Sequence, residues 1–468
     1  MLCLVSGCGK VNPAEPADAP PDADPRGPVH VTVRDVIGNG APAPNIPVVF
    51  IDPDGTVVAD IVSDADGRAT ANVLPGASVS AVYQQLSTTT VVMTTNIRYL
   101  FVSVLGVKPG DDLPIGFTDR DFTNSGTFNV TFQPFTGATT YDIFTPCGLT
   151  SSTTPNTAIP VQMQNSCKRD SFDILVVARD ASNNALAGAI ATNVSLSAGS
   201  AAVPGTYTST NSFAASYTDI PAGISSVSVT RVASDTLNGF SVNGTCTPAA
   251  GACSITPVQV TTISPKSVLQ TSISRTVPTG MPSQSQTYIQ RVGGANLNYS
   301  LDVATNLLPF MTNVVFDPAT NTITPTVEAP VTDADEFIID ASYSRSTSTT
   351  EANGDTLVTN TSIEALAIGP AVGPLSFPTL PSHVGPIYYQ AGDTAGTAIG
   401  FTIDGSSVKG YDAARKQAFD LIDELSRANG PNDIVRGQLI GVPLIPPPPA
   451  SIAKSQPAAL EAPLLLRR

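Results

Sequence analysis

Four cysteines in the middle of the chain have the clearest potential for chemistry. They are Cys147, Cys167, Cys246 and Cys253. An even number of cysteines predicts disulfides in an oxidising compartment, and two local pairs, Cys147–Cys167 and Cys246–Cys253, are the simplest of three connectivities. A bond that closes a loop of about 15–20 residues contributes roughly 3 kcal/mol in the chain-entropy model. The alternative is a four-cysteine zinc site, and the lack of any C-x-x-C pair argues against it.

Catalytic chemistry has little support in the residue types. Only two histidines occur, His30 in a strand pattern and His383 in a loop, which argues against a histidine triad or a multi-histidine metal site. No G-x-S-x-G, H-E-x-x-H or P-loop motif is present. Asp393-Thr394-Ala395-Gly396 departs from the D-T-G of aspartic proteases by one alanine. We therefore predict no catalytic, cofactor-binding or metal-binding residue and no cofactor. A pair of carboxylates placed for glycoside hydrolysis stays open, because sequence gives no distances.

One acidic motif has two interpretations. Asp64-Ala65-Asp66-Gly67 looks like half of a calcium loop, but no acid follows at the twelfth position that such a loop requires. Aspartate and glycine are also typical turn residues. We predict a β-turn here.

Composition narrows the function classes. Charged residues make up 13% of the 468 residues, where about 25% is typical, and the net charge is −15. A chain this acidic is unsuited to binding nucleic acid through a basic patch. No later segment reaches 18 consecutive apolar residues, so we expect no transmembrane helix. The length is sufficient for about three or four domains.

The first eight residues bear on the cellular location of the protein. Leu4-Val5-Ser6-Gly7-Cys8 resembles the lipobox of bacterial lipoproteins, and the resemblance implies cleavage before Cys8 and lipid on that cysteine. Gly9, in place of aspartate, implies the outer membrane of a Gram-negative bacterium, on its periplasmic or outer surface. The basic n-region of a signal peptide is missing, so we expect a start codon upstream. The alternative is a chance cysteine near a misassigned start. The Pro-rich residues 9–28 predict an extended spacer.

Strict alternation begins at Val29, Val31 and Val33 and predicts a half-buried strand. Similar patterns at 46–51, 56–62, 68–74, 78–83, 89–93 and 99–104, separated by turns such as Asp52-Pro53-Asp54-Gly55, predict a β-sandwich. Val31-Thr32-Val33-Arg34-Asp35, Ser63 to Ala69 and Leu74-Pro75-Gly76 resemble the carboxypeptidase regulatory-like domain and its bacterial Ig-like relatives. The resemblance covers residues 28–105 and implies a non-catalytic, prealbumin-like sandwich with glycan-binding relatives.

The remaining chain repeats this pattern of alternating segments separated by turns. The fold class that we predict is all-β, with tandem sandwich modules. The predicted units are 1–8, 9–28, 29–116, a fibronectin- or Ig-like sandwich at 117–196 with the first disulfide, 197–262, 263–443 and a disordered tail at 444–468. In the third sandwich, Cys246 and Cys253 predict a hairpin closed by its disulfide. In the unit 263–443, residues 337–343 alternate, 344–355 form a polar loop, and 412–429 predict the one helix.

These patterns favour a protein without enzymatic activity. We expect a lipid-anchored envelope protein with a structural, adhesive or protein-binding role, in which edge strands pair with a partner. A carbohydrate-binding surface module is the first alternative, although tryptophan is absent and Tyr388-Tyr389, read as a strand with one buried ring, is the best aromatic pair. A hydrolase with unrecognised acids is the second.

Overall fold

β-Strands make up most of the described chain. The computed structural model describes residues 25–35, 41–89, 94–117, 124–145, 147–164, 170–212, 214–235, 238–248, 251–255, 258–260, 267–279, 282, 284–291, 298–317, 320–332, 334–350, 356–370, 372–385, 388–390, 393–394, 396–417 and 434–443. Helical structure in these ranges is short: α1 (Val303–Asn306), α2 (Tyr411–Ala414) and the 3-10 turns η2 (Leu196–Ala198) and η3 (Ser382–Val384). The predicted all-β class is confirmed. None of the described helices is long and apolar enough to span a membrane.

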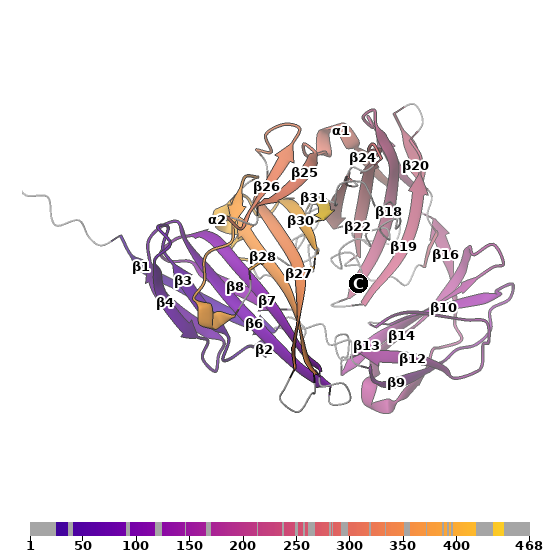
Figure 1. Cartoon of the computed structure of the whole chain (residues 1–468). Helices are drawn as coiled ribbons and strands as arrows, with labels where there is room; N and C mark the ends of the chain where they lie inside the picture. Colours follow the sequence, from indigo (N-terminus) through magenta and orange to yellow (C-terminus); the bar gives the residue numbers. More distant parts are fainter. Residues whose placement is uncertain are drawn as a thin grey trace, which may run out of the picture.

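One twelve-stranded sheet crosses the molecule (Figure 1). Its neighbours pair antiparallel throughout, except that β28 and β7 run parallel. In order across the sheet the strands are β19 (Asn238–Cys246), β18 (Ile224–Asp235), β22 (Ser267–Arg275), β23 (Gln284–Arg291), β31 (Ile434–Pro443), β30 (Thr397–Gly405), β27 (Glu336–Thr350), β28 (Thr356–Gly369), β7 (Thr94–Val107), β6 (Ala77–Thr89), β3 (Pro47–Ile51) and β4 (Val57–Val62).

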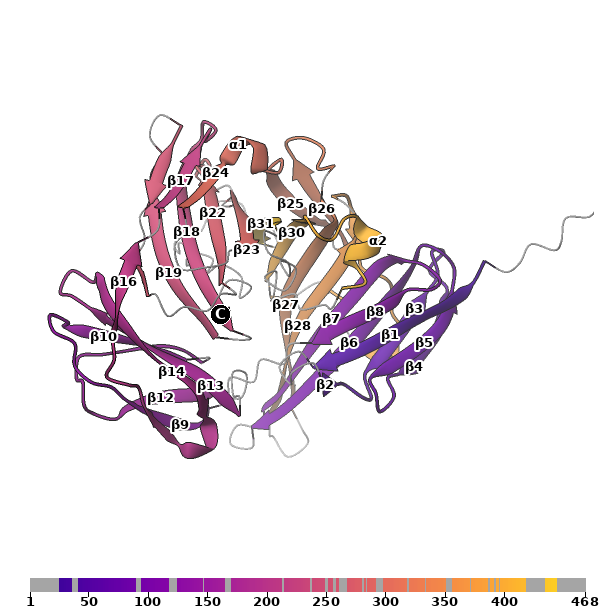
Figure 2. The ribbon, with the colours of Figure 1, turned by 180° about the vertical axis from the view of Figure 1, so that it is seen from behind.

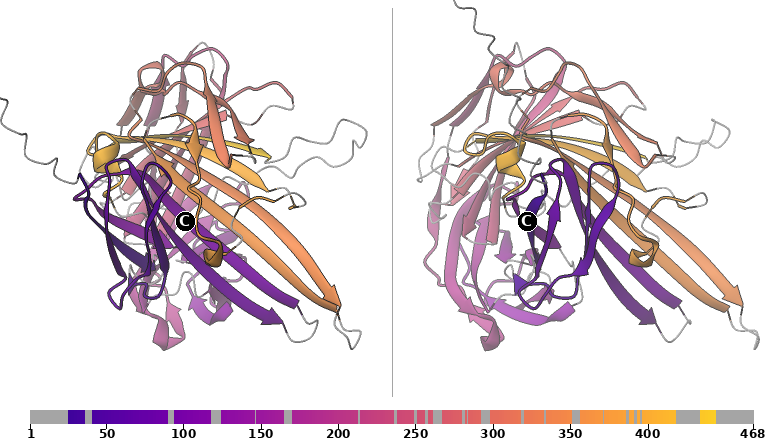
Figure 3. Two further views of the ribbon diagram at one scale, coloured as in Figure 1. Left: turned by 60° about the vertical axis from the view of Figure 1, so that its left-hand side comes forward. Right: turned by 90° about the vertical axis from the view of Figure 1, so that its left-hand side faces the viewer.

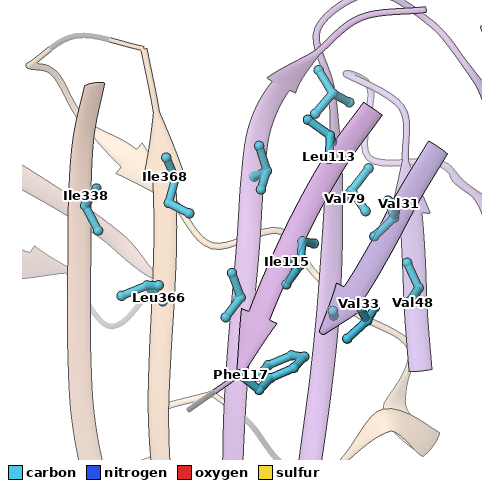
Figure 4. Close-up of a cluster of buried hydrophobic side chains, with 14 of the residues drawn as sticks. Val31, Val33, Val48, Val79, Leu113, Ile115, Phe117, Ile338, Leu366 and Ile368 are labelled. Carbon is cyan, nitrogen blue, oxygen red and sulfur yellow. The ribbon is translucent and has the colours of Figure 1, made fainter. Parts of the chain in front are cut away.

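A small sheet covers one face of this large sheet near the N-terminus. It contains β1 (Gly27–Asp35), β2 (Ala41–Pro42), β5 (Arg68–Val73) and β8 (Asp112–Phe117). Val29, Val31 and Val33 are fully buried beneath it, as their alternation predicts. Figure 4 shows that the same core continues past β7 to Ile368 on β28, so the first sandwich shares its core with C-terminal strands.

The separation predicted between residues 29–116 and 263–443 is therefore wrong. Strand β7 pairs with β28 from Thr94 and Val358 to Val104 and Ile368. The inner half of β7 is almost entirely apolar, with the buried Ser103 as an exception, and such a pattern is typical of a strand inside a sheet rather than at its edge. The edge that β7 leaves open within the first sandwich is filled by a strand from the far end of the chain.

The opposite face of the large sheet has its own cover. Strands β25 (Met311–Asp317), β26 (Thr322–Val327) and β29 (Leu375–Ser376) form a three-stranded sheet. Beneath it, Phe337, Ile339, Ala341 and Tyr343 are buried, as the alternation at 337–343 predicts. The middle of the large sheet is thus packed on both faces.

A second sandwich lies at the other end of the molecule from β1 (Figure 2). The central strand β13 (Ser171–Arg179) carries the apolar run that the sequence shows there, and Ile174 and Val176 are fully buried. One sheet contains β9 (Asn124–Thr131), β12 (Ile159–Gln164) and β15 (Ser200–Ala202); the other contains β10 (Thr140–Thr145), β11 (Gly148–Ser152), β13, β14 (Ala185–Ser195), β16 (Thr208–Ser212) and β21 (Val258–Val260).

A third packing layer covers the end of the large sheet formed by β18, β22 and β23. It consists of β17 (Ala214–Thr218), β20 (Cys253–Ile255) and β24 (Asn298–Asp302). Ala215 and Tyr217 of β17 are fully buried against Val227 and Val229 of β18. The boundaries predicted at 117–196 and 197–262 stay predictions.

The predicted helix at 412–429 begins within the described residues. Helix α2 begins at Tyr411, so Asp412 lies in its first turn rather than at its cap, which is Gly410. The helix ends at Ala414, and the chain continues as a turn while the side chain of Arg415 pairs with the buried Asp111. Residues 418–429 lie outside the described residues, as do the lipobox, residues 9–24 of the spacer and the tail at 444–468.

Candidate functional site

The predicted Cys246–Cys253 disulfide is present, but it does not close a hairpin. Cys246 and Cys253 are bonded, with 6.1 Å between their Cα atoms. Cys246 belongs to β19, which pairs with β18, whereas Cys253 belongs to β20, which pairs with β17. The predicted hairpin is wrong, because each strand finds its partner in a different sheet. The bond therefore connects the two layers of the third packing unit.

The other predicted cysteine sites are less fully described. Cys147 is disulfide-bonded. Cys167, its predicted partner, lies outside the described residues, and so does Cys8, the predicted lipidation site. That pairing and the lipid therefore stay predictions.

The two histidines make separate structural contacts. His30 Nδ1 lies 2.9 Å from the hydroxyl of Thr70 on the neighbouring strand β5. His383 Nε2 lies 2.8 Å from Asp60 on β4, where it connects η3 to the edge of the large sheet. Among the described residues, no group of three or more histidine, cysteine or acidic side chains is placed to hold a metal ion.

The two acidic motifs are explained by local structure. Asp64 accepts hydrogen bonds from the N–H groups of Asp66 and Arg68, and Gly67 has a φ of +72°, so the predicted β-turn is confirmed. Asp393 is buried, and its carboxylate accepts from Arg345 at 2.9 Å and from the N–H of Gln390 at 2.8 Å. The motif that resembles a protease sequence is thus an anchored turn.

The prediction of a strand at the aromatic pair Tyr388-Tyr389 is wrong. Tyr388 and Tyr389 lie in a loop, and both rings are partly buried against the core below β25. The hydroxyl of Tyr388 accepts from the N–H of Leu380 at 2.6 Å, and burial raises its pKa to about 12. The ring of Tyr389 packs edge-on against Phe316 and Tyr343. Neither ring forms an exposed platform for a sugar.

A shallow hollow of about 540 Å³ lies in the second sandwich. Phe128 and Met163 line it, and among its described lining residues Asp170 is the one that carries a charge. A single carboxylate provides no acid–base pair and no charged clamp for a ligand. The hollow therefore supplies no argument for catalysis.

The feature that remains is a part of the large sheet that extends beyond its covering layers. It contains 85–89 of β6, 94–98 of β7, 356–362 of β28 and 344–350 of β27, and we call it the projecting arm. Figure 3 shows these four strands running together away from the rest of the molecule. Both of its hairpins end in residues outside the described ranges.

The composition of the large sheet changes where the arm begins. One row across three strands contains the buried side chains of Tyr99, Ile363 and Tyr343. Four residues further out on each strand, and on the same face, the row contains Thr95, Thr359 and Thr347. Hydroxyl groups thus replace apolar groups at this row, where Thr95 and Thr359 are half-buried and Thr347 is exposed.

Polar side chains connect the strands of the arm on its other face. The side-chain amide of Asn360 donates to the side-chain oxygen of Asn96 at 3.1 Å, across the parallel pair β28–β7. The hydroxyl of Ser346 donates to the side-chain oxygen of Asn360 at 2.9 Å, across β27 and β28. Arg98 and Glu364 form an exposed ion pair nearer the body. These contacts hold the two hairpins in register without a hydrophobic core.

Arg345 fixes the base of the arm. Its Nη2 donates to Asp393 and, at 2.6 Å, to the backbone carbonyl of Tyr388. Ser344 and Thr394 form a short bridge beside it, with N–H···O distances of 3.4 and 2.7 Å. Beyond this bridge, no strand in the described part of the chain pairs with the outer edge of β27.

The sequence prediction missed this arm because it interpreted 344–355 as a polar loop. Ser344–Thr350 is in fact the outer half of β27, and Thr356 begins β28. Alternation of apolar and polar residues identifies a strand only where one face is buried. The available signal was the run of β-branched threonines, which favours strands even when both faces are exposed.

Comparison with known proteins gives no family. No protein-family model and no curated protein matches the chain. Among solved structures, the Bacillus anthracis TIE protein is 9% identical with a TM-score of 0.15, covering 59% of this chain and 50% of that one. The major pilin subunit of Bacillus cereus is 8% identical with a TM-score of 0.13, covering 59% and 99%. Two B repeat units of the collagen binding protein of Staphylococcus aureus are 9% identical with a TM-score of 0.10, covering 72% and 99%.

The chain thus spans about half the length of the Bacillus anthracis protein. At these TM-scores the similarity supports no argument about function, and the all-β class rests on the strands of this chain. What the protein does must be inferred from its own residues, and above all from the projecting arm.

Proposed function

We propose that this protein is a non-enzymatic adhesive or protein-binding component of the cell envelope, whose contact surface is the projecting arm. The observation that carries the proposal is the outer edge of β27 beyond Ser344, with which no strand among the described residues pairs. Open edges pair readily with an extended segment of another chain, because their N–H and C=O groups have no partner in the sheet. The partner is an extended polypeptide at the envelope.

Two features of the chain fit a location outside the cytoplasm. The Cys246–Cys253 disulfide suits an oxidising compartment. Leu4-Val5-Ser6-Gly7-Cys8 resembles a lipobox, followed by a Pro-rich spacer. In the proposal, lipid on Cys8 anchors the chain to the outer membrane, and the spacer holds the folded part away from the headgroups. More than one acyl chain is needed for stable anchoring.

The binding role is tested with two substitutions at one edge position. Ser348→Pro removes one N–H from the outer edge and is tolerated at an edge strand, whereas Ser348→Ala keeps that N–H. The immobilised chain and both variants are incubated with solubilised envelope proteins, and the bound material is quantified. We expect binding to the wild type and to Ser348→Ala, and a loss of at least tenfold with Ser348→Pro. Equal binding to all three would refute the arm as the contact surface.

The anchor is tested separately. Cells that express the gene with its upstream DNA are labelled with radioactive palmitate, beside a Cys8→Ser variant. Label on the wild type that is absent from the variant supports lipidation. Equal label on both chains, or no label on either, refutes the anchor and leaves the proposal for the arm standing. Protease treatment of intact cells then distinguishes the outer surface from the periplasm.

A further inference from the structure

The outer edge of β27 has a defined hydrogen-bonding pattern. Ser344 directs both its N–H and its C=O toward Thr394, away from β28. Because these groups alternate sides with a period of two, Ser346, Ser348 and Thr350 direct theirs the same way. No strand of the described chain lies against these three residues. The edge therefore presents a regular row of donors and acceptors.

The side chains of this edge lack the usual protection against pairing. Edge strands in soluble proteins commonly carry a lysine, a proline, a bulge or an inward charge that blocks association. Residues 346–350 read Ser-Thr-Ser-Thr-Thr and are all exposed. The register of β27 with β28 continues without a bulge to Thr350. The cation next to this edge in the sequence, Arg345, is paired with Asp393. An uncharged edge of five residues, without a bulge, is thus retained in a chain of net charge −15.

We propose that the occupant of this edge is a second copy of the same chain. Two copies pair antiparallel through Ser346–Thr350, centred on Ser348, and join their arms into one eight-stranded sheet. The proposal rests on the proposed function of the arm and names its partner. A two-fold axis through the seam makes the contact isologous, so both copies use the same five residues.

Self-pairing suits the chemistry of the edge. With Ser348 opposite its own copy, each cross-strand pair joins two hydroxyl-bearing residues, and such pairs are favourable in sheets. A basic or acidic partner strand would find no opposite charge among residues 346–350. The absence of charge also means that two copies do not repel each other at the seam, although the bodies of both are acidic.

The geometry of the arm favours the antiparallel direction. The arm extends outward from the body (Figure 3), so antiparallel pairing places the two bodies at opposite ends of the joined sheet. Parallel pairing would place both bodies at the same end, while the paired strands lie only about 4.8 Å apart. Bodies of twelve-stranded width and like charge cannot occupy that arrangement.

The contact is small, and this determines how it must be measured. Stable interfaces bury about 1,200–2,000 Å² in total, and a five-residue edge buries less than that, so the dimer is weak and forms at high protein concentration. Salt strengthens it, because ions screen the repulsion between the acidic bodies while the seam itself carries no charge. Association that weakens with added salt would contradict an uncharged seam.

The experiment is sedimentation equilibrium of the full chain over a concentration series, with three variants at position 348. Ser348→Pro removes the outward N–H, Ser348→Lys places like charges opposite each other across the two-fold axis, and Ser348→Ala is the matched control. We expect a monomer–dimer equilibrium for the wild type and for Ser348→Ala. We expect dissociation constants at least tenfold higher for Ser348→Pro and Ser348→Lys. Circular dichroism checks that each variant is folded. If the proline variant is not folded, the lysine variant alone tests the pairing at position 348.

Three results would overturn the inference: a wild type that stays monomeric at all concentrations, a Ser348→Lys chain that dimerises as tightly as the wild type, or growth into larger polymers. None of these results would refute the proposed function. That proposal fails only if envelope proteins bind equally well to the wild type and to Ser348→Pro, so the two failures are distinguishable.

Discussion

Arg415 donates from Nε to Asp111 Oδ2 at 2.8 Å and from Nη2 to Oδ1 at 3.2 Å, and the two residues lie 304 positions apart. Both side chains are almost completely buried. Arg415 also pairs with Asp412, and its guanidinium lies 5.3 Å from the ring centre of Tyr411. The pair fastens the segment after β30 to the turn before β8. It therefore holds together the two ends of the chain that share the large sheet.

Asp111→Ala should strongly destabilise the protein. The change leaves Arg415 buried without its main partner, and breaking a buried pair in this way costs about 3–5 kcal/mol. Equilibrium urea unfolding measures the loss. Lys416→Met is the matched control, because Lys416 also reaches Asp111, at 3.1 Å, but is 46% exposed. Its cost should stay below about 1 kcal/mol. Equal costs for the two variants would contradict a role for burial.

The same cluster predicts a response to acid. Hydrogen bonds from Lys108 and then Arg415 lower the pKa of Asp412 to about 2. Burial alone would raise the pKa of Asp111, but hydrogen bonds from Arg415, the N–H of Lys108 and Lys416 outweigh it and lower that pKa. A lowered pKa stabilises the fold above the unfolded value of about 3.9, and the stabilisation disappears as the pH falls through the folded value.

We therefore expect α2 to stay docked from neutral pH to about pH 4 and to be released below it. Near-ultraviolet circular dichroism follows the tyrosines, and the difference between wild type and Tyr411→Phe isolates the signal from α2. In Asp412→Asn the part of the transition nearest pH 2 should vanish. A transition centred between about pH 5 and 7 would show that these carboxylates do not control docking.

The Cys246–Cys253 bond should contribute stability by joining two layers. It closes a loop with a sequence separation of 7. The chain-entropy relation gives about 2 kcal/mol for so short a loop. The double variant Cys246→Ser and Cys253→Ser should lose that amount in urea unfolding without reductant. Because the bond joins β19 to β20, hydrogen exchange should rise in β17 and β20 rather than along a hairpin. Unchanged exchange in β17 would contradict this role.

Local patterns of the sequence predicted much of the fold. The alternation at Val29, Val31 and Val33 identified a buried face, and the Asp64–Gly67 motif identified a turn, because both depend on neighbours within a few residues. The partner of each strand is not local. Nothing in the sequence of β7 specifies that β28, more than 250 residues away, lies beside it. The same limit explains why the Cys246–Cys253 pairing was predicted correctly but the hairpin around it was not.

The candidate site was harder to predict for a related reason. Sequence patterns reveal a strand through the apolar residues on its buried face, and the outer half of β27 has no buried face. Thr347 and Thr349 are compatible with a loop or with a strand in a sheet that is solvated on both sides. Only the pairing with β28 decides between them. A functional surface made of backbone groups at a sheet edge leaves no motif in the sequence.

Arg345→Met should loosen the base of the projecting arm. Arg345 and Asp393 have side-chain exposures of 12% and 3%, so the variant leaves a buried carboxylate without its cation. The expected cost is about 3–5 kcal/mol. Arg98→Met is the matched control on the same arm, because its pair with Glu364 is 29% and 46% exposed and should be worth less than about 1 kcal/mol.

Hydrogen exchange locates the effect of Arg345→Met. The Thr394 N–H, which donates to Ser344 at 2.7 Å, should exchange faster in Arg345→Met and at the wild-type rate in Arg98→Met. The double variant Arg345→Met with Asp393→Leu removes both charges, and it should recover part of the lost stability because no uncompensated charge stays buried. If the single and double variants are equally unstable, the pair acts through packing rather than charge. In that case the base of the arm is held by Tyr388 and Tyr389 instead, since both rings pack against the same core.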